Sequence, residues 1–207
     1  MSEAVGARRV ERREREHAAA RASILSAARN LAVREGAQGL TLRGVAAEAG
    51  YAPAALYGYF RNRNELILTL AADDLAQLTH AMREAAKSDA PGSALVRVAS
   101  AALARLRDSE TIAAAISTLD SSTESSGAER VFNGRLIAWL KVLSEIAGRP
   151  SESRDGQCDV LLIAAALAGL VLLDRSGRLK ALGFHTDELV ERLEGRFAGV
   201  WPPTHLP

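Results

Sequence analysis

The chain has 207 residues, enough for one ordinary domain or for two small domains that share a core. Hydrophobic residues make up 48% of it and charged residues 25%, so the chain can bury a sizeable core, and wholesale disorder is excluded. The single cysteine, Cys158, excludes a disulfide scaffold. Neither this cysteine nor the four scattered histidines have metal-ligand spacing, so we expect no metal and no cofactor.

The ends of the chain and its apolar runs predict where the protein resides. The N-terminus is charged where a signal peptide would be apolar. The longest apolar run, Val160 to Leu173, has 14 residues, whereas a helix needs about 20 to span a bilayer. We therefore expect a cytoplasmic protein that does not enter a membrane.

The formal net charge of +1 conceals a difference between two parts of the chain. Residues 1–70 contain 11 Arg and 7 Glu, a net +4, and residues 71–207 contain 15 Lys and Arg against 18 Asp and Glu, a net −3. The first third is therefore the part suited to a polyanion. Only Lys87, Lys141 and Lys180 are lysines; arginine suits phosphate, but a base-composition bias of the genome explains the excess equally well.

The apolar periodicity is helical throughout, and it predicts an all-α fold of about nine helices. Residues 1–17 form a charged arm without apolar period, and a first helix with apolar positions from Ile24 to Ala32 ends at Gly36. Two short helices follow at residues 42–49 and 53–60, with Thr41 and Gly50 as caps of the first and Pro53 in the first turn of the second. A longer helix runs from about Asn62 into the 80s.

The remainder of the chain predicts five further helices. Apolar stripes run from Leu95 to Leu106, through Ile112 and Ile116 after a cap at Ser109, and from Phe132 to Leu143. The polar stretch 120–127 is expected to be a loop. An all-round apolar helix covers 160–173, and a last helix from about Thr186 carries Leu189, Leu193, Phe197 and Val200.

The helices predicted at 42–49 and 53–60 have the spacing of a helix-turn-helix, because a turn of three to four residues that contains Gly50 joins them. Ala46 and Ala49 are small enough for the helices to cross closely. Leu56 and Phe60 would face inward, which leaves neighbouring side chains on the outer surface. All three tyrosines, Tyr51, Tyr57 and Tyr59, lie here, and their hydroxyl groups can bind phosphate oxygens.

Residues 41–66, TLRGVAAEAGYAPAALYGYFRNRNEL, closely resemble the DNA-binding domain of the tetracycline-repressor (TetR-like) family. Ile24 to Ala28 and Gly36 are similar to that family's first helix, so the resemblance covers about residues 21–70. Residues 71–207 are similar only in length and helical character. The resemblance implies a charged arm (1–20), a three-helix DNA-binding domain (21–65) and an effector-binding and dimerisation domain (66–207).

The resemblance also implies roles for individual residues. Thr41, Tyr57 and Arg63 would hold phosphates, and the residues facing the major groove would be Arg43, Tyr51, Pro53, Ala54, Ala55 and Tyr59. Ala54 and Ala55 depart from the Gly, Thr or Ser often found there, and alanine can touch a thymine methyl group but cannot hydrogen-bond to a base. Base reading therefore depends on Arg43 and the tyrosines.

Two features of this region, the tyrosines and the arginine cluster near the N-terminus, have an alternative interpretation. Tyr57 and Tyr59 could be ordinary half-buried helix residues. The arginines at positions 8, 9, 12, 13 and 15 alternate with Glu11, Glu14 and Glu16, which is typical of a solvated helix or tail. The alternative for these arginines is an arm that reaches a minor groove or neighbouring phosphates.

The C-terminal part predicts an effector site and a dimer interface. The apolar residues expected to line the effector site are Leu103, Leu106, Ile116, Phe132, Leu136, Trp139 and Leu140, with Asp174 or Arg135 as an orienting contact. A filled core explains the same apolar residues. The helix at 160–173 is too apolar for one protomer to cover, so Ala165, Gly169, Leu189, Leu193 and Phe197 are expected in a symmetric interface.

The expected function is a homodimeric repressor that a small, largely hydrophobic effector releases from a near-palindromic DNA operator. Two alternatives stay open: a DNA-binding protein regulated by a partner protein, and a helical interaction module that no longer binds DNA. The sequence contains no glycine-rich phosphate loop, nucleophile elbow or paired-carboxylate motif, so we do not expect an enzyme.

Overall fold

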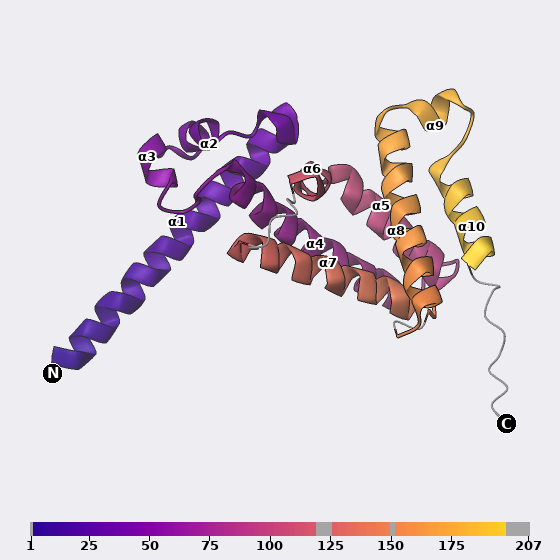
Figure 1. The fold of residues 1–207 in the computed structure, drawn as a ribbon, viewed down its shortest axis with the longest axis horizontal. Coiled ribbons are helices and arrows are strands. Elements are labelled where there is room, and N and C mark those ends of the chain that lie inside the picture. Colours follow the sequence, from indigo (N-terminus) through magenta and orange to yellow (C-terminus); the bar gives the residue numbers. More distant parts are fainter. Residues whose placement is uncertain (1, 119–125, 150–151, 198–207) are drawn as a thin grey trace. The chain divides into compact units, whose positions relative to one another are not determined.

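The structure is a computed structural model that describes residues 2–118, 126–149 and 152–197, with side chains from residue 8. These residues form ten helices and no strand, which confirms the predicted all-α fold (Figure 1). The helices are α1 (Ser2–Gly39), α2 (Leu42–Ala49), α3 (Pro53–Leu56), α4 (Arg63–Lys87), α5 (Ala94–Asp108), α6 (Thr111–Thr118), α7 (Gly127–Ile146), α8 (Arg154–Arg175), α9 (Arg178–Ala181) and α10 (Thr186–Phe197).

The helices divide into two compact units. The first unit contains residues 1–71 and 110–129, and the second contains residues 72–109 and 130–207. Helix α4 belongs to both units, and the predicted domain boundary after residue 65 falls inside it. Most of the predicted loop 120–127, and also Val200, lie outside the described residues.

The core of the first unit forms where α1 packs on α2 and α6 and where α2 packs on α3. The apolar residues expected to face inward are buried, among them Ile24, Ala28, Val45, Leu56 and Phe60. Leu66, Ile67 and Leu70 at the start of α4 are also buried. The apolar periodicity of the sequence therefore identified this core correctly.

The charged arm is helical and continuous with α1, which is one of the two forms, a solvated helix or a tail, that its charge pattern is typical of. The stretch has no apolar period, but Arg12 pairs with Glu16 and Glu11 with Arg15, each four residues apart on one helix. Such pairs, together with the three alanines at 18–20, favour a helix without any apolar face.

Two helix ends follow from glycine. Gly36 adopts φ 70° and ψ 167°, so α1 is broken there as predicted, although helical residues resume up to Gly39. Helix α3 ends at Leu56, four residues before the predicted end. Beyond it the chain turns through Gly58, whose amide donates to the Ala55 carbonyl at 3.1 Å. Glycine disfavours the helical conformation, so the regular helix ends early.

In the second unit α8 packs on α5 and α10, and α10 also packs on α5. Val160, Ile163, Leu167 and Val171 form the buried face of α8. The four-residue α9 was not predicted; it begins after Gly177, a left-handed residue at φ 69°. Since so short a helix has no apolar period, the sequence gives no signal for it.

Helix α8 is the one helix in the described part of the chain that is long and apolar enough to cross a membrane. One third of its most apolar window is buried against the rest of the fold. The helix is thus partly a core element of the second unit, and its remaining face carries the exposed Leu161, Leu162 and Leu172.

Candidate nucleic-acid interface

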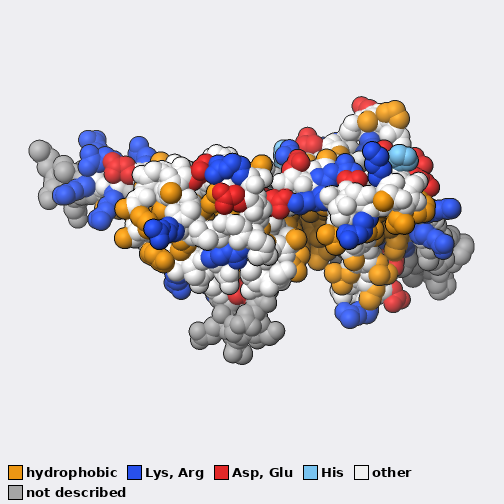
Figure 2. Space-filling model, turned by 90° about the horizontal axis from the view of Figure 1, so that it is seen from above, with side chains coloured by type: hydrophobic (Ala, Val, Ile, Leu, Met, Phe, Trp, Pro, Cys, Tyr) orange, Lys and Arg blue, Asp and Glu red, His pale blue; other side chains and the backbone are white. Residues whose placement is uncertain are grey.

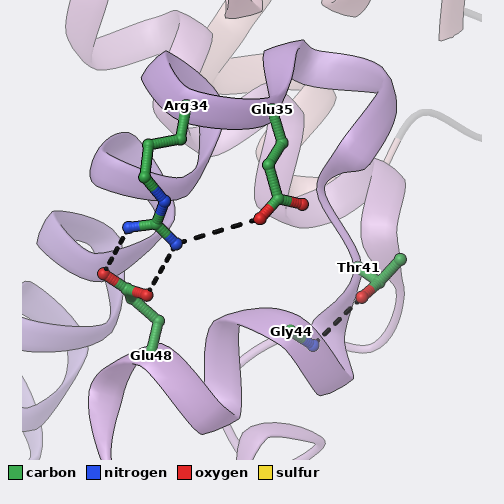
Figure 3. A network of polar contacts seen from close by, with 5 residues as sticks. All are labelled: Arg34, Glu35, Thr41, Gly44 and Glu48. Carbon is green, nitrogen blue, oxygen red and sulfur yellow. Dashed lines mark hydrogen bonds and ion pairs between the residues drawn. The ribbon is translucent and has the colours of Figure 1, made fainter.

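Helix α2 is fixed at its N-terminus and on its outer face (Figure 3). The Thr41 hydroxyl accepts a hydrogen bond from the Gly44 amide at 3.0 Å, which caps α2 as predicted. The Arg34 guanidinium on α1 donates two hydrogen bonds of 2.9 Å to the two carboxylate oxygens of Glu48. These bonds hold the pKa of the Glu48 carboxyl below its ordinary value.

The turn between α2 and α3 has the predicted helix-turn-helix form. Gly50 takes the left-handed conformation at φ 72°, and the Tyr51 amide donates back to the Ala46 carbonyl at 2.9 Å. Pro53 opens α3, and Pro53, Ala54 and Ala55 are all exposed. Since Leu56 is fully buried, it anchors α3 with these three residues facing outward.

One surface hollow gathers the predicted phosphate-binding residues. It has a volume of about 350 Å³ and is lined by Thr41, Leu42, Arg43, Tyr57, Arg61, Asn62 and Arg63. Tyr57 is 63% exposed, so it is not a half-buried helix residue. Arg43 and Arg61 are also exposed. Two exposed cations, a phenol and a helix N-terminus beside one hollow are groups that can bind a phosphate.

Arg63 differs from the other residues of the hollow because its guanidinium also bonds within the domain. Its Nε donates to the Leu40 carbonyl at 2.6 Å, and an η nitrogen donates to the Ala37 carbonyl at 2.7 Å. The Ala37 carbonyl lies in the last turn of α1 and the Leu40 carbonyl directly after it, at a helix end where carbonyls lack partners within the helix ladder. Arg63 therefore joins α1 to α4, and its predicted phosphate contact stays a prediction.

The other two tyrosines form a ring cluster with a residue of α1. The Tyr51 and Tyr59 rings meet edge to face, with centroids 6.5 Å apart. The His17 ring stacks on Tyr59 with centroids 4.6 Å apart and an angle of 23°. Both tyrosines are half-buried. This cluster lies beside α3, the helix expected to enter the major groove.

The sequence interpretation did not assign His17, Arg61 and Asn62 to this surface. Arg61 has a signal in the sequence, since its charge lies two residues after Tyr59 and two before Arg63. His17 lies seven residues before the buried Ile24, so an extension of the helical period would have placed both on one face. Its contact with Tyr59 joins residues 42 positions apart, and local periodicity does not give such a pairing.

The residues predicted to line an effector site have different surroundings in the structure. Leu103, Phe132 and Trp139 are buried in the second unit, and the Trp139 indole N–H donates to the Met82 sulfur at 3.1 Å. Asp174 is paired with Arg107 at 2.7 Å and accepts a hydrogen bond from Thr186 at 3.3 Å. Leu106, Leu136 and Leu140 are half-buried, Arg135 is exposed, and Ile116 is an exposed residue of the first unit.

A pocket in the second unit includes one residue of that set. Leu140 lies in an open pocket of about 310 Å³ between α7 and α8, which is otherwise lined by Ile137, Lys141, Ser144, Gln157, Val160 and Leu161. Most of its wall is aliphatic, and Lys141 and Gln157 supply polar groups. This is the general make-up of a site for an apolar ligand with a polar end.

The residues predicted for a dimer interface are accessible on the single chain. Ala165 is exposed, and Gly169, Leu189, Leu193 and Phe197 are half-buried. A Cβ atom at Gly169 would meet no atom within 4 Å, so packing within the protomer does not require glycine there. On α10 the buried residue is Val190, and Leu189, Leu193 and Phe197 of the predicted stripe each keep part of their surface accessible.

Comparison with known proteins gives a family match to the DNA-binding region. Residues 24–70 match the family model described as bacterial regulatory proteins, tetR family. The matched residues include α2, α3 and the beginning of α4, and with them the hollow and the ring pair of Tyr51 and Tyr59.

The fold of nearly the whole chain is similar to that of solved regulators. A TetR transcriptional regulator from Rhodococcus sp. RHA1 is 20% identical with a TM-score of 0.64, over 90% of this chain and 100% of that one. FadR from Bacillus subtilis, solved with stearoyl-CoA, is 20% identical with a TM-score of 0.58, over 86% and 98%. PfmR, a TetR family transcriptional regulator from Thermus thermophilus, is 18% identical with a TM-score of 0.60, over 86% and 99%.

Proposed function

We propose that this chain, which belongs to the TetR family of bacterial regulatory proteins, is a repressor that a small, largely hydrophobic effector releases from its operator. Members of this family are DNA-binding transcriptional regulators and not enzymes. The observation that carries the proposal is the exposed α3 beside a hollow that contains Arg43, Tyr57 and Arg61. A repressor that binds the bacterial chromosome acts in the cytoplasm.

The proposed docking follows from the exposure of these side chains. Helix α3 enters the major groove with Pro53, Ala54 and Ala55 toward the bases, and Tyr51, Tyr59 and Arg43 flank it. Thr41, Tyr57 and Arg61 bind backbone phosphates around the hollow, where the N-terminus of α2 adds its partial positive charge. Arg43 is the side chain able to make a bidentate contact with guanine.

The experiment is a DNA-binding assay with a duplex selected by the full-length protein from a random-sequence pool. Arg43→Ala should reduce discrimination at one or two base pairs, each worth about 1–3 kcal/mol, because a bidentate contact to guanine is lost. Binding to an unrelated duplex should change little. If the pool yields no enriched sequence and no salt-dependent shift, the chain is an interaction module and the proposal fails.

The effector class is proposed from the second unit. The pocket between α7 and α8 is mostly aliphatic, and Lys141 in its lining is able to pair with an anionic group. FadR from Bacillus subtilis, similar in fold, was solved with stearoyl-CoA, an acyl chain with a charged head. Long-chain acyl compounds are therefore the first ligands to test, and the residues around Trp139 remain the alternative site.

Ligand binding is measured by thermal stabilisation with a panel of acyl-CoA esters and free fatty acids, followed by release of the selected duplex. Leu140→Ala should reduce both the thermal stabilisation by the ligand and the release of the duplex, since Leu140 belongs to both candidate sites. Trp139 fluorescence separates them, because only a ligand in contact with the buried indole changes its emission strongly. Stabilisation by a ligand that leaves the duplex bound would favour a regulator controlled by a partner protein.

We also propose a homodimer in which α8 and α10 of two protomers form a four-helix interface. Leu161, Leu162 and Leu172 expose more than half of their surface along α8, and Gly169 leaves room for a partner helix to approach. A two-fold axis would present two α3 helices to successive major grooves about 34–36 Å apart on a near-palindromic site.

A further inference from the structure

The first turns of α1 carry more positive charge than their internal ion pairs neutralise. Residues 8–17 contain five arginines and three glutamates. Arg12 pairs with Glu16 at 3.5 Å, and Arg15 pairs with Glu11 at 2.6 Å. Within the described chain Arg8, Arg9 and Arg13 have no ion-pair partner, and all three are exposed. Figure 2 shows several Lys and Arg side chains, in blue, with some acidic side chains, in red, at the left-hand end of the view.

Two of the three unpaired arginines lie nearer to the His17 side of the helix than to the opposite side. Arg13 is four residues and Arg9 eight residues before His17, which at 100° per residue places them about 40° and about 80° from His17 around α1. The His17 ring stacks on Tyr59 at 4.6 Å, and one turn later the Arg21 guanidinium lies 5.1 Å from the centre of the Phe60 ring. Arg13 therefore lies close to the side of α1 that packs on the helix-turn-helix, and Arg9 lies at the edge of that side.

The paired arginines lie elsewhere on the helix. Arg12 is five residues before His17 and Arg15 is two residues before it, which at 100° per residue places both on the side away from Tyr59. Their carboxylate partners lie one turn away on the same helix. Pairing thus neutralises Arg12 and Arg15. Of the three arginines without an ion-pair partner in the described chain, Arg8 lies on the side away from His17, nine residues before it, and Arg9 and Arg13 are the two nearer to the side that carries His17.

From this juxtaposition we propose that the first three turns of α1 form a second DNA-contacting element, in which Arg9 and Arg13 bind backbone phosphates next to the base pairs read by α3. The inference rests on the proposed function, since it extends the same interface. At 1.5 Å per residue Arg13 lies about 6 Å and Arg9 about 12 Å from His17 along the helix axis. Both residues thus lie on α1 beyond the turn whose His17 stacks on Tyr59, which flanks α3.

His17 acts in this element as a positioning residue. Before it, residues 8–16 are all exposed, so nothing in the first unit holds this stretch except its continuation into α1. The groove beside it, lined by Val10, Arg13, Glu14, His17, Ala18 and Arg21, has a volume of about 630 Å³ and is open. The stack on Tyr59 ties the helix to the recognition region through a residue that also lines this groove.

The test measures how binding depends on salt for two variants with equal loss of charge. The proteins are the full chain, Arg9→Ala/Arg13→Ala, and Arg12→Ala/Arg15→Ala as the matched control. The probes are a labelled duplex selected by the parent from a random-sequence pool and an unrelated duplex of equal length. Each phosphate contact contributes about 0.9 to the slope of log K against log salt. The Arg9/Arg13 variant should lose about 1.8 from the slope on both duplexes.

For the control variant the slope of log K against log salt should stay within about 0.45 of the parental slope, which is half the contribution of one phosphate contact. The reason is that Arg12 and Arg15 already pair with glutamates. His17→Ala should remove part of the contribution that Arg9 and Arg13 make to the slope of log K against log salt. His17→Phe should retain that contribution, because a phenylalanine ring can still stack on Tyr59. Circular dichroism verifies that each variant retains its helices. Hydroxyl-radical footprints should be shorter for the Arg9/Arg13 variant than for the control.

The outcomes separate this inference from the proposed function. If both double variants lower the slope equally, the effect is one of net charge, and the specific contact is wrong. If the Arg9/Arg13 variant binds both duplexes like the parent, the inference fails while the DNA-binding function stands. If the parent binds neither duplex, the proposed function fails first, and binding of the arm to an acidic protein becomes the alternative.

Discussion

Arg61 and Arg63 are two positions apart in the sequence, but their side chains have different surroundings. Both line the hollow beside α2, where Arg61 is exposed and Arg63 is half-buried. Arg63 donates to the carbonyls of Leu40 and Ala37 at the end of α1. The exposed residue is therefore available to DNA, and the half-buried one stabilises the domain that presents it.

Alanine substitution at these two positions should have different effects. Arg61→Ala should leave the unfolding temperature nearly unchanged. It should lower the slope of log K for DNA binding against log salt by about 0.9, the contribution of one phosphate contact. Arg63→Ala should lower the free energy of unfolding by roughly 1.5–3 kcal/mol, because two charge-assisted hydrogen bonds are lost. Denaturant unfolding and fluorescence anisotropy measure the two quantities. Equal stability of both variants would contradict the structural role of Arg63.

Glu48 gives the first unit a dependence on acid pH. The hydrogen bonds from Arg34 lower the pKa of its carboxyl from the ordinary value of 4.5. A group whose pKa is lower in the folded state contributes stability above its ordinary pKa, and that contribution is lost as the pH falls through the folded value. The bond between α1 and α2 should therefore weaken below about pH 4.5 and be intact at neutral pH.

Glu48→Gln should flatten the pH dependence of stability between about pH 3 and 6, measured by thermal unfolding at constant ionic strength. Glu14→Gln is the matched control, because Glu14 has no ion-pair partner in the described residues of α1. Added salt should reduce the difference, since the Arg34–Glu48 pair lies at the surface. A Glu48→Gln variant with the parental pH profile would show that the pair contributes nothing.

Among the secondary-structure elements, α1 depends on one glycine for its shape. Gly36 adopts φ 70° and ψ 167°, a conformation that is essentially restricted to glycine. A Cβ atom at this position would meet only the Glu110 carboxylate, at 4.0 Å. The requirement for glycine is therefore one of backbone conformation and not of space.

Gly36→Ala should lower the free energy of unfolding by about 1–3 kcal/mol through backbone strain. Gly134→Ala on the exposed side of α7 is the control, since nothing lies within 4 Å of its added Cβ and alanine favours a helix by up to about 1 kcal/mol. Chemical denaturation of the two variants should thus give shifts of opposite sign. A stable Gly36→Ala variant would mean that α1 straightens at no cost.

The elements of the first unit could be predicted because their signals are local. The cap at Thr41, the left-handed Gly50 and the apolar positions of α2 each depend on residues within one or two turns. Apolar periodicity could not distinguish a helical arm from a tail, because the ion pairs along this helix, and not an apolar face, stabilise it. The donation from Arg63 to Leu40 and the ring contact between His17 and Tyr59 join distant positions, so they required the structure.

The same reasoning explains why the second unit was less predictable. Apolar periodicity gives the buried side of a helix, but it does not distinguish a filled core from a ligand site. Trp139 illustrates this, because its burial against Met82 satisfies both the apolar pattern and the indole N–H. The pocket between α7 and α8 depends on how two helices diverge, and of its lining only Leu140 belongs to the set predicted for the effector.

At the scale of the whole molecule, dimerisation and DNA binding should be lost together. Leu193→Glu and Gly169→Leu should each reduce the dimer fraction and the affinity for the full selected site, although neither residue belongs to the DNA-binding region. The reason is that linking two half-site contacts in one particle raises affinity through effective concentration. Analytical ultracentrifugation and binding to full-site and half-site duplexes measure the two effects.

Val131→Glu is the matched control for these variants, since Val131 is an exposed apolar residue on α7 with 55% of its surface accessible. It should leave both the dimer fraction and the DNA affinity unchanged. The dimer proposal is contradicted if the parent sediments as a monomer and still binds the full site tightly, or if the control variant dissociates as readily as Leu193→Glu.

The exposed surface of α3 has a consequence for how this regulator could diverge in evolution. Pro53, Ala54 and Ala55 present no hydrogen-bonding group to a base, so they impose little preference beyond contact with a thymine methyl group. Alanine codons become serine or threonine codons by a single nucleotide change, and each such change adds a hydroxyl group where none exists. A duplicated gene could therefore acquire a new operator preference in one mutational step while the buried Leu56 and the helix caps keep the domain folded.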